Sequence, residues 1–301
     1  MQTKRQIQQL LDSVGVRPNK KFGQHFLIDL NLMRLLVESA NINSNDIVLE
    51  VGCGTGSLTS ELVERAGFVI AVELDKTLAL LAKNSLTNAD NIELINTDIL
   101  KNKHTLSHEV VNSLESARKK YNGRILLVAN LPYNVASPTI MNLVTGPILA
   151  DAMYITIQKE VADRMIARPN SDHYGILSIL LSAVGHTRII RVLKPTVFWP
   201  QPQVDSAMVE FVRKEEDFER IKNMDLFNEI VNLFMGHRRK TLTACSRLAA
   251  GKLAKIDNIQ GISWPEIFRQ CDIVPTKRPE QLSSEQYIAI SNTCFAALEN
   301  A

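Results

Sequence analysis

The sequence lacks the features that mark secreted, membrane-spanning and zinc-binding chains. No apolar run approaches the ~18 residues of a transmembrane helix, and the N-terminus carries no apolar signal segment. The four cysteines form no C-x-x-C pair and match no zinc-ligand spacing: Cys53, Cys245, Cys271 and Cys294. These absences favour free thiols in a reducing compartment. We therefore expect a cytoplasmic protein with no metal site and no membrane contact.

An excess of charge of one sign is also missing. Lys and Arg number 34 against 32 Asp and Glu, so the formal net charge is only +2. Any contact with a polyanion must then come from local basic clusters rather than from a field over the whole molecule. With 301 residues, of which 45% are hydrophobic, the chain has room for one large domain and a small one.

A glycine-rich turn follows the first clear strand. The short strand expected over Ile47–Val51 leads into Gly52-Cys53-Gly54-Thr55-Gly56 and then into a helical pattern. A strand, a glycine-rich turn and a helix N-terminus together form a cradle in which backbone N–H groups approach a ligand. Ser57 stands where a dinucleotide-binding motif has its last glycine, which disfavours a nicotinamide dehydrogenase. The G-x-G-x-G spacing instead resembles that of nucleoside-dependent methyltransferases, although many sharp turns carry similar glycines.

Two later strands end in acidic residues. Phe68–Val72 leads into Glu73, and the strand expected over 91–96 leads into Asp98 and Ile99. A carboxylate at the tip of the second strand can accept hydrogen bonds from both ribose hydroxyls. Asp98 is placed to accept from an adenine amine while Ile99 packs on the ring. Either acid alone could cap a helix, but together with the glycine-rich turn they predict a bound nucleoside.

The most informative stretch is Asn130-Leu131-Pro132-Tyr133, which follows the buried apolar run Ile125–Ala129. The Asn side-chain oxygen and nearby carbonyls can accept both protons of a planar exocyclic amine, and the Tyr ring can stack on its base. Pro132 fixes its own φ and restricts the residue before it, so these acceptors would be held in place. The alternative is an ordinary Pro turn in which Asn130 bonds its own backbone.

Alternating strands and helices up to about residue 215 predict a doubly wound α/β sheet with ligands at the carboxyl ends of its strands. Beyond that point the pattern becomes helical, so we expect two domains, 1–215 and 216–301. The polar segment 101–122 is expected to be a solvated surface helix or insertion.

Two basic segments could contact phosphates. One is the N-terminal stretch 1–24, which includes Lys20 and Lys21, and the other is Arg238-Arg239-Lys240. The alternatives are a solvated terminus for the first and a charged helix end for the second.

Taken together, the chain resembles the small-subunit ribosomal RNA adenine dimethyltransferases of the bacterial KsgA type. The similarity runs nearly end to end and is carried by nine segments in order: Lys21–Leu27, the Gly52 loop, Ala71–Asp75, Asn130–Asn134, Gln158–Arg164, Tyr174–Ser178, Gln203–Ala207, His237–Leu242 and Arg278–Ser283. The chain departs from the family at His25, Cys53 and His237, where Asn, Pro and Gln are usual.

The resemblance implies a Rossmann-like class I methyltransferase fold with a small all-α C-terminal domain, and S-adenosylmethionine as cofactor. Its cofactor-binding residues would be His25, Leu27, Gly52, Gly54, Glu73, Asp98, Ile99 and Asn130. Asn130 with the Leu131 carbonyl would hold the target amine, Pro132 would fix the turn, and Tyr133 and Phe198 would sandwich the base. Lys20, Lys21, Arg238, Arg239 and Lys240 would contact RNA.

The implied reaction is transfer of methyl groups to N6 of two adjacent adenosines near the 3′ end of small-subunit rRNA. The target must be looped out or flipped to enter the pocket. The implied partner is the pre-ribosomal 30S particle, and we expect a monomer. Two other functions stay open: a large-subunit rRNA adenine methyltransferase of the antibiotic-resistance type, and a non-catalytic rRNA-binding assembly factor with the same fold.

Overall fold

The structure is a computed structural model that describes residues 1–19, 23–258 and 263–299. Its contacts divide the chain into two compact units. The first unit comprises Met1–Ala162 and Arg188–Val212, and the second comprises Asp163–Thr187 and Arg213–Ala301.

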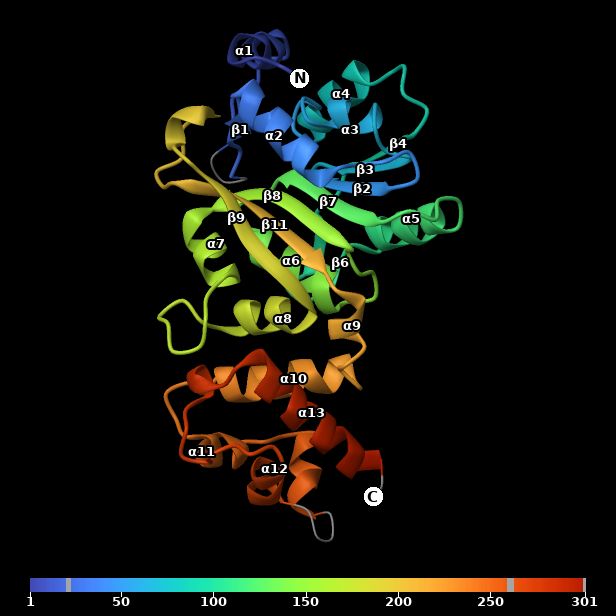
Figure 1. The fold of residues 1–301 in the computed structure, drawn as a ribbon. Coiled ribbons are helices and arrows are strands. Elements are labelled where there is room, and N and C mark those ends of the chain that lie inside the picture. The colour runs from blue at the N-terminus through green and yellow to red at the C-terminus, as the bar shows by residue number, and fades with distance from the viewer. Residues whose placement is uncertain (20–22, 259–262, 300–301) are drawn as a thin grey trace. The chain divides into compact units, whose positions relative to one another are not determined.

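A seven-stranded sheet forms the centre of the first unit (Figure 1). The strand order is β4-β3-β2-β7-β8-β11-β9. Strands β4, β3, β2, β7 and β8 run parallel, and β11 pairs with β8 in the antiparallel direction. The bounds are β2 (Ile47–Val51), β3 (Phe68–Val72), β4 (Ile92–Ile95), β7 (Ile125–Asn130), β8 (Ala152–Gln158), β9 (Gly185–Leu193) and β11 (Ser206–Arg213). The expected Rossmann-like α/β class is confirmed.

The strands form where the sequence has continuous apolar runs. Every residue of β2 is buried, as are the first five residues of β7, because helices cover both faces of a parallel sheet. One core cluster joins α2 to these strands and includes Leu36, Val48 and Leu126. The helices of this part of the chain are α2 (Leu30–Ala40), α3 (Thr59–Val63), α4 (Lys76–Ser85), α5 (His108–Arg118), α6 (Ala136–Thr145) and α7 (Lys159–Met165).

Two short antiparallel pairs lie outside the main sheet. Strand β1 (Phe26–Leu27) pairs with β10 (Phe198–Trp199), which follows the 3-10 turn η2 (Pro195–Val197). Strands β5 (Leu100–Asn102) and β6 (Thr105–Leu106) form a small hairpin. The β1–β10 pair brings residues near position 26 beside residues near position 199.

The segment 101–122 is not the solvated spacer that the sequence suggested. Helix α5 buries Val110 and Leu114 and packs against β2, β3 and β4. Among its polar residues, apolar residues recur at helical spacing and form one buried face. This segment is therefore part of the fold.

The N-terminal stretch also differs from the expected arm. Residues Lys4–Ser13 form helix α1, which begins with a capping box between Thr3 and Gln6. Two of its apolar residues, Ile7 and Leu11, lie four positions apart and are buried in a cluster with Leu78. Although most residues of α1 are polar or basic, two buried side chains are enough to dock a short amphipathic helix.

The second unit is helical. Its aromatic core centres on Phe234, whose ring contacts those of Trp264, Phe268 and Tyr287. The Tyr174 hydroxyl donates to the Leu282 carbonyl, which ties the 163–187 segment to this unit. The elements are α8 (Ile176–Val184), α9 (Glu215–Phe218), α10 (Met224–Met235), α11 (Leu242–Ser246), η3 (Leu253–Asn258), α12 (Trp264–Gln270), η4 (Pro279–Gln281) and α13 (Ser284–Glu299).

Helix α8 belongs to this second unit although it lies before the expected boundary at residue 215. Nearly all of its side chains are buried, and it packs against α10 and α13. None of the helices in the described part of the chain combines the length and apolar character that crossing a bilayer requires.

Candidate functional site

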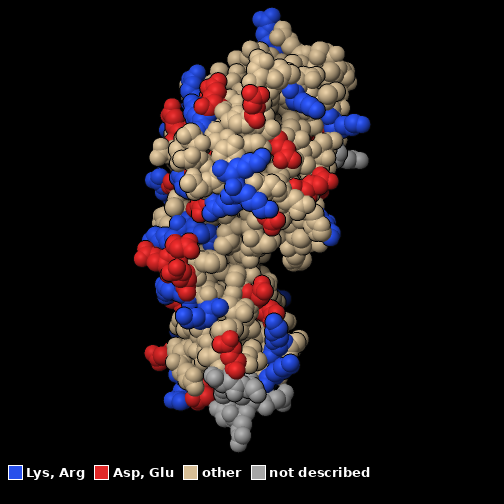
Figure 2. Space-filling view, turned by 90° about the vertical axis from the view of Figure 1, so that its right-hand side faces the viewer, with Lys and Arg blue, Asp and Glu red and all other residues tan. Residues whose placement is uncertain are grey.

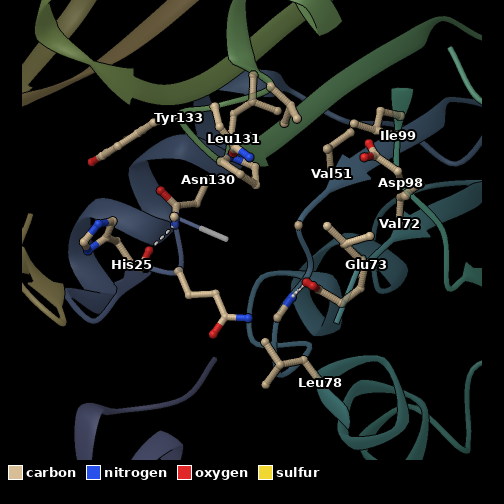
Figure 3. A pocket seen from close by; sticks show the side chains of 18 of the residues that line it. His25, Val51, Val72, Glu73, Leu78, Asp98, Ile99, Asn130, Leu131 and Tyr133 are labelled. Atoms are coloured by element: carbon tan, nitrogen blue, oxygen red, sulfur yellow. Dashed lines mark hydrogen bonds between the residues drawn. The ribbon is translucent and has the colours of Figure 1, made fainter. Parts of the chain in front are cut away.

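A pocket lies at the carboxyl ends of the parallel strands, with an empty volume of about 740 Å³. It lies at the edge of the sheet where α/β folds bind ligands. Figure 3 shows side chains from separate strands pointing into it. It is lined by Gly23, Gln24, His25, Phe26, Val51, Gly52, Gly54, Val72, Glu73, Leu74, Leu78, Thr97, Asp98, Ile99, Asn130, Leu131, Pro132, Tyr133, Asn134 and Val135.

The glycine-rich turn after β2 forms one wall. Gly52 has φ +78°, and a Cβ at this position would lie 2.7 Å from Pro132 Cγ. Gly54 has φ +59°, and a Cβ there would lie 2.9 Å from the Phe26 ring. Both positions require glycine for conformation and for space. The turn therefore forms a cradle that approaches the Asn130–Tyr133 segment closely.

Glu73 lies beside this turn at the end of β3 and is 7% exposed. Its carboxylate accepts a hydrogen bond from the backbone N–H of Gly54 at 2.8 Å (Figure 3). It accepts a second from the backbone N–H of Asp75 at 2.9 Å. Burial raises the pKa of this carboxyl, while the two backbone donors act in the opposite direction. Each oxygen keeps capacity for a second donor, which suits a pair of vicinal hydroxyls.

Asp98 and Ile99 line the pocket after β4. Asp98 is exposed, and its Oδ1 accepts from the Leu100 backbone N–H at 2.9 Å. Ile99 is buried and presents an apolar surface beside it. The carboxylate and the aliphatic side chain together match the needs of a flat, amine-bearing ring.

The Asn130 side chain is held by two hydrogen bonds. Its Nδ2 donates to the His25 carbonyl at 2.6 Å (Figure 3), and its Oδ1 accepts from Thr156 Oγ1 at 2.5 Å. These partners fix which end of the amide is oxygen. Because an amide oxygen has two lone pairs, Oδ1 can still accept a proton from a ligand amine.

The turn that follows is fixed by its backbone. Leu131 N–H donates to the Thr156 carbonyl at 3.0 Å, and Val135 N–H donates to the Pro132 carbonyl at 3.2 Å. The Tyr133 hydroxyl shares a 2.7 Å hydrogen bond with Ser206, and burial raises the pKa of this phenol. The ring of Tyr133, which lines the pocket, is thus held in place.

The ring that faces Tyr133 is His25. The two ring centroids are 5.6 Å apart with nearly parallel planes, and His25 Nδ1 donates to the Pro200 carbonyl at 2.7 Å. Rings at this distance are in mutual contact. A base could enter between them only if one ring moved.

Phe198 and Leu27, both expected at the site, do not line this pocket. They pair with each other across β1 and β10, and Phe198, at 1% exposure, belongs to the core cluster. The neighbouring Trp199 is only half-buried and stacks on Phe26. The base contact of Phe198 and the cofactor contact of Leu27 stay predictions.

The structure describes three of the five basic residues that were expected to contact RNA. Arg238, Arg239 and Lys240 are exposed and follow α10. Arg238 interacts with Glu280 at 3.7 Å and donates to the Tyr174 carbonyl at 3.5 Å. Lys20 and Lys21 lie outside the described residues.

One buried carboxyl group behind the glycine-rich turn was not expected from the sequence. Glu50 in β2 is buried, and its Oε2 has no hydrogen-bond partner among the described residues. Burial raises its pKa to about 8, the nearby Thr59 hydroxyl lowers it and Glu73 raises it further. Glu50 lines a second, smaller cavity beneath the turn, together with Ile7 of α1.

Thr156, Gln24 and Ser206 contribute to the site without having been predicted. Gln24 Nε2 donates to Asp75 Oδ2 at 3.2 Å, and Thr156 and Ser206 orient Asn130 and Tyr133. Thr156 and Ser206 reach these positions only through the register of β7 with β8 and of β8 with β11. Among the described residues, no group of three His, Cys, Asp or Glu side chains could hold a metal ion.

Known proteins share this architecture and sequence. A family profile described as "Ribosomal RNA adenine dimethylase" matches residues 15–268. A protein of Alkaliphilus oremlandii named "Ribosomal RNA small subunit methyltransferase A" is 37% identical over 276 residues, which cover 91% of each chain. One of the same name from Clostridium perfringens is 36% identical over 292 residues, covering 97% of this chain and 96% of that protein.

Two solved structures match the fold. A dimethyladenosine transferase from Plasmodium falciparum aligns with a TM-score of 0.70 and 24% identity, covering 87% of this chain and 94% of that one. The 23S rRNA methyltransferase ErmE aligns with a TM-score of 0.60 and 20% identity, covering 89% and 98%. At these identities the two matches show the fold alone.

Proposed function

This chain belongs to the ribosomal RNA adenine dimethylase family, and from that membership we propose that it methylates N6 of two adjacent adenosines near the 3′ end of small-subunit rRNA. The chain is accordingly an rRNA adenine dimethyltransferase that uses S-adenosylmethionine. The single observation that carries the finer proposal is the placement of Asn130. Asn130 lines the same pocket as the glycine-rich turn and Glu73.

The residues of the pocket fit the cofactor. The turn at Gly52 and Gly54 leaves space that a side chain would fill. Glu73, Asp98 and Ile99 are the residues we assign to the ribose, the adenine amine and the adenine ring. When bound, S-adenosylmethionine supplies an electrophilic methyl group on a positively charged sulfur.

The amine nitrogen of adenine is a poor nucleophile because its lone pair is delocalised into the ring. We assign Asn130 Oδ1 and the Leu131 carbonyl as acceptors for its two protons, which would draw the nitrogen toward a tetrahedral shape and localise that lone pair. Thr156 and His25 hold the Asn130 amide in one orientation, so the acceptor is in place before the base arrives. Since attack makes the amine strongly acidic, no general base is required beforehand.

RNA contact is assigned to local basic residues. On the face shown in Figure 2, basic and acidic side chains are interspersed rather than separated into fields, as the net charge of +2 suggests. Arg239 and Lys240 are exposed, whereas Arg238 also has partners within its own unit. We assign residues 1–215 to catalysis and 216–301 to RNA contact, with Arg239 and Lys240 as the phosphate-binding pair.

The natural substrate we propose is the pre-ribosomal 30S particle in the cytoplasm, bound by a monomer. The test is methyl transfer from labelled S-adenosylmethionine to purified small and large subunits that lack the modification, with the modified nucleotides mapped. We expect dimethyladenosine at two adjacent positions of the small-subunit rRNA only. Modification of the large subunit would favour the antibiotic-resistance type, and absence of transfer to both would favour the assembly factor.

A further inference from the structure

Residue Gln2, just before α1, is joined to the glycine-rich turn by three hydrogen bonds. Its side-chain Nε2 donates to the Thr55 carbonyl at 3.2 Å, and Thr55 Oγ1 donates back to Gln2 Oε1 at 2.6 Å. The Gln2 backbone N–H also donates to Ser57 Oγ at 2.7 Å. One residue at the start of the chain therefore contacts two residues of the turn more than 50 positions away.

The side-chain pair is complementary in both directions. The Gln2 amide offers one donor and one acceptor, and Thr55 offers a carbonyl and a hydroxyl in the matching order. Thr55 is only 1% exposed, so water cannot readily replace Gln2 as its partner. Loss of the amide would leave the buried hydroxyl and carbonyl of Thr55 with poorer partners, although Ser85 Oγ also reaches that carbonyl at 3.4 Å.

The rest of α1 packs against other parts of the pocket wall. Ile7 and Leu11 form a buried cluster with Leu78, against which Phe26 and Trp199 pack. Leu78 and Phe26 also line the cofactor pocket. Figure 1 shows α1 at the same end of the first unit as α3 and α4. Helix α1 thus contacts α4 and β1, while Gln2 contacts the glycine-rich turn.

We propose that residues 2–13 act as a strap that holds the glycine-rich turn in its cofactor-binding conformation, with Gln2 as the positioning residue. The turn has positive φ at Gly52, Gly54 and Gly56, and glycines at such positions have many alternative conformations. An external tether raises the fraction of molecules in which the turn is ready to bind, and apparent affinity rises in proportion to that fraction. The inference rests on the proposed assignment of this pocket to S-adenosylmethionine.

The test uses the whole chain of 301 residues, four single variants and the double variant Gln2→Ala/Thr55→Val. Gln2→Ala removes the side-chain pair, Thr55→Val removes its hydroxyl, and Thr55→Ser restores that hydroxyl. Gln9→Ala, at an exposed position of the same helix, is the matched control. Calorimetry measures the dissociation constant for S-adenosylmethionine, steady-state kinetics separates its KM from kcat, and thermal melting reports folding.

We expect Gln2→Ala and Thr55→Val each to raise the dissociation constant and KM for S-adenosylmethionine by about three- to tenfold, as expected for the loss of one or two hydrogen bonds, with kcat unchanged. The double variant should lose no more than either single one, because both disrupt the same pair. Thr55→Ser and Gln9→Ala should behave as the wild type.

Wild-type affinity in Gln2→Ala would overturn the strap, and so would a lower melting temperature without a change in affinity, which would make Gln2 merely structural. If the wild-type protein itself does not bind S-adenosylmethionine, the proposed cofactor site is wrong, and the strap proposal is wrong with it. The two failures are therefore told apart by the wild-type measurement.

Discussion

The Thr156 hydroxyl donates a hydrogen bond to the side-chain oxygen of Asn130, its direct neighbour across strands β7 and β8. Thr156 is fully buried and does not line the pocket, so this hydrogen bond acts on the site only through Asn130. The adjacent strand thereby fixes the direction in which the proposed amine acceptor points.

We expect Thr156→Val to lower kcat by about ten- to a hundredfold while the dissociation constant for S-adenosylmethionine stays within about twofold, because only the orientation of Asn130 is disturbed. The substitution keeps the shape of the side chain and removes the donor. Thr156→Ser retains the hydroxyl and should restore most of the activity. Equal rate constants for methyl transfer in single-turnover experiments on all three proteins would show that Thr156 contributes only to core packing.

Gly52 provides a test of how closely the turn approaches the Asn130–Tyr133 segment. Gly52→Ala combines a positive φ with a contact of 2.7 Å to Pro132, whereas Gly15→Ala has a positive φ and nothing within 4 Å. The left-handed conformation should cost each variant about 1 kcal/mol in the free energy of unfolding. The clash should cost Gly52→Ala about 1–3 kcal/mol more.

Gly52→Ala should also lose at least about tenfold in cofactor affinity, since the wall of the cradle must shift. Urea denaturation and calorimetry measure the two effects. Equal stability and equal cofactor affinity in the two alanine variants would mean that Pro132 moves aside at little cost. The glycine-rich turn and the Asn130–Tyr133 segment would then not be tightly packed.

Because Glu50 is buried, we expect the free energy of unfolding to depend on pH in an unusual way. Its folded pKa of about 8 lies above the ordinary value of 4.5. Below pH 4.5 both states hold the proton. As the pH rises from 4.5 to 8 the unfolded chain loses the proton while the folded chain keeps it, so the free energy of unfolding falls by up to about 1.4 kcal/mol per pH unit.

Glu50→Gln should abolish this contribution. Urea denaturation between pH 5 and pH 8 should therefore show the stability of the variant relative to wild type increasing steadily with pH. Other carboxyl groups titrate alike in both proteins and cancel from the difference. Parallel stability curves would mean that Glu50 ionises normally.

Arg239 and Lys240 are proposed to contact the phosphate backbone. Replacing both with Ala should weaken binding to small-subunit rRNA and reduce the slope of log K against log salt by about 0.7–0.9 for each phosphate that the protein no longer neutralises. Lys119 and Lys120 are a matched exposed pair after α5, before the first residue of β7, and they do not line the pocket. Their double Ala variant should keep the wild-type slope, and an equal reduction in both variants would point to non-specific attraction.

Much of the fold follows from local sequence signals. Strand β3 and residues 125–129 of β7 are continuous apolar runs, and β2 is interrupted only by Glu50, so their burial in an α/β sheet was predictable. Gly52 and Glu73 directly follow β2 and β3, Asn130 is the last residue of β7, and Asp98 lies shortly after β4. Parallel strands bring their carboxyl ends to one edge of the sheet. For this reason the sequence could place these residues around a common pocket.

The missed features depend on tertiary contacts. Thr156 sits in an apolar strand and looks like any β-branched core residue until the register of β7 with β8 is known. The contact of His25 with Tyr133 depends on the path of a loop rather than on spacing. Helix α1 has only two buried apolar residues, too few to distinguish docking from a solvated basic arm, and α8 joins the second unit through packing alone.

The central claim is that the Asn130 side-chain oxygen holds the target amine, and Asn130→Ala tests it most directly. Methyl transfer to unmodified small subunits and binding of S-adenosylmethionine should be measured on the same preparation. We expect methyl transfer to fall by at least about a hundredfold, as when a pre-organised polar group is removed from an active site, with cofactor affinity within about threefold of wild type. Wild-type turnover in this variant would contradict the account.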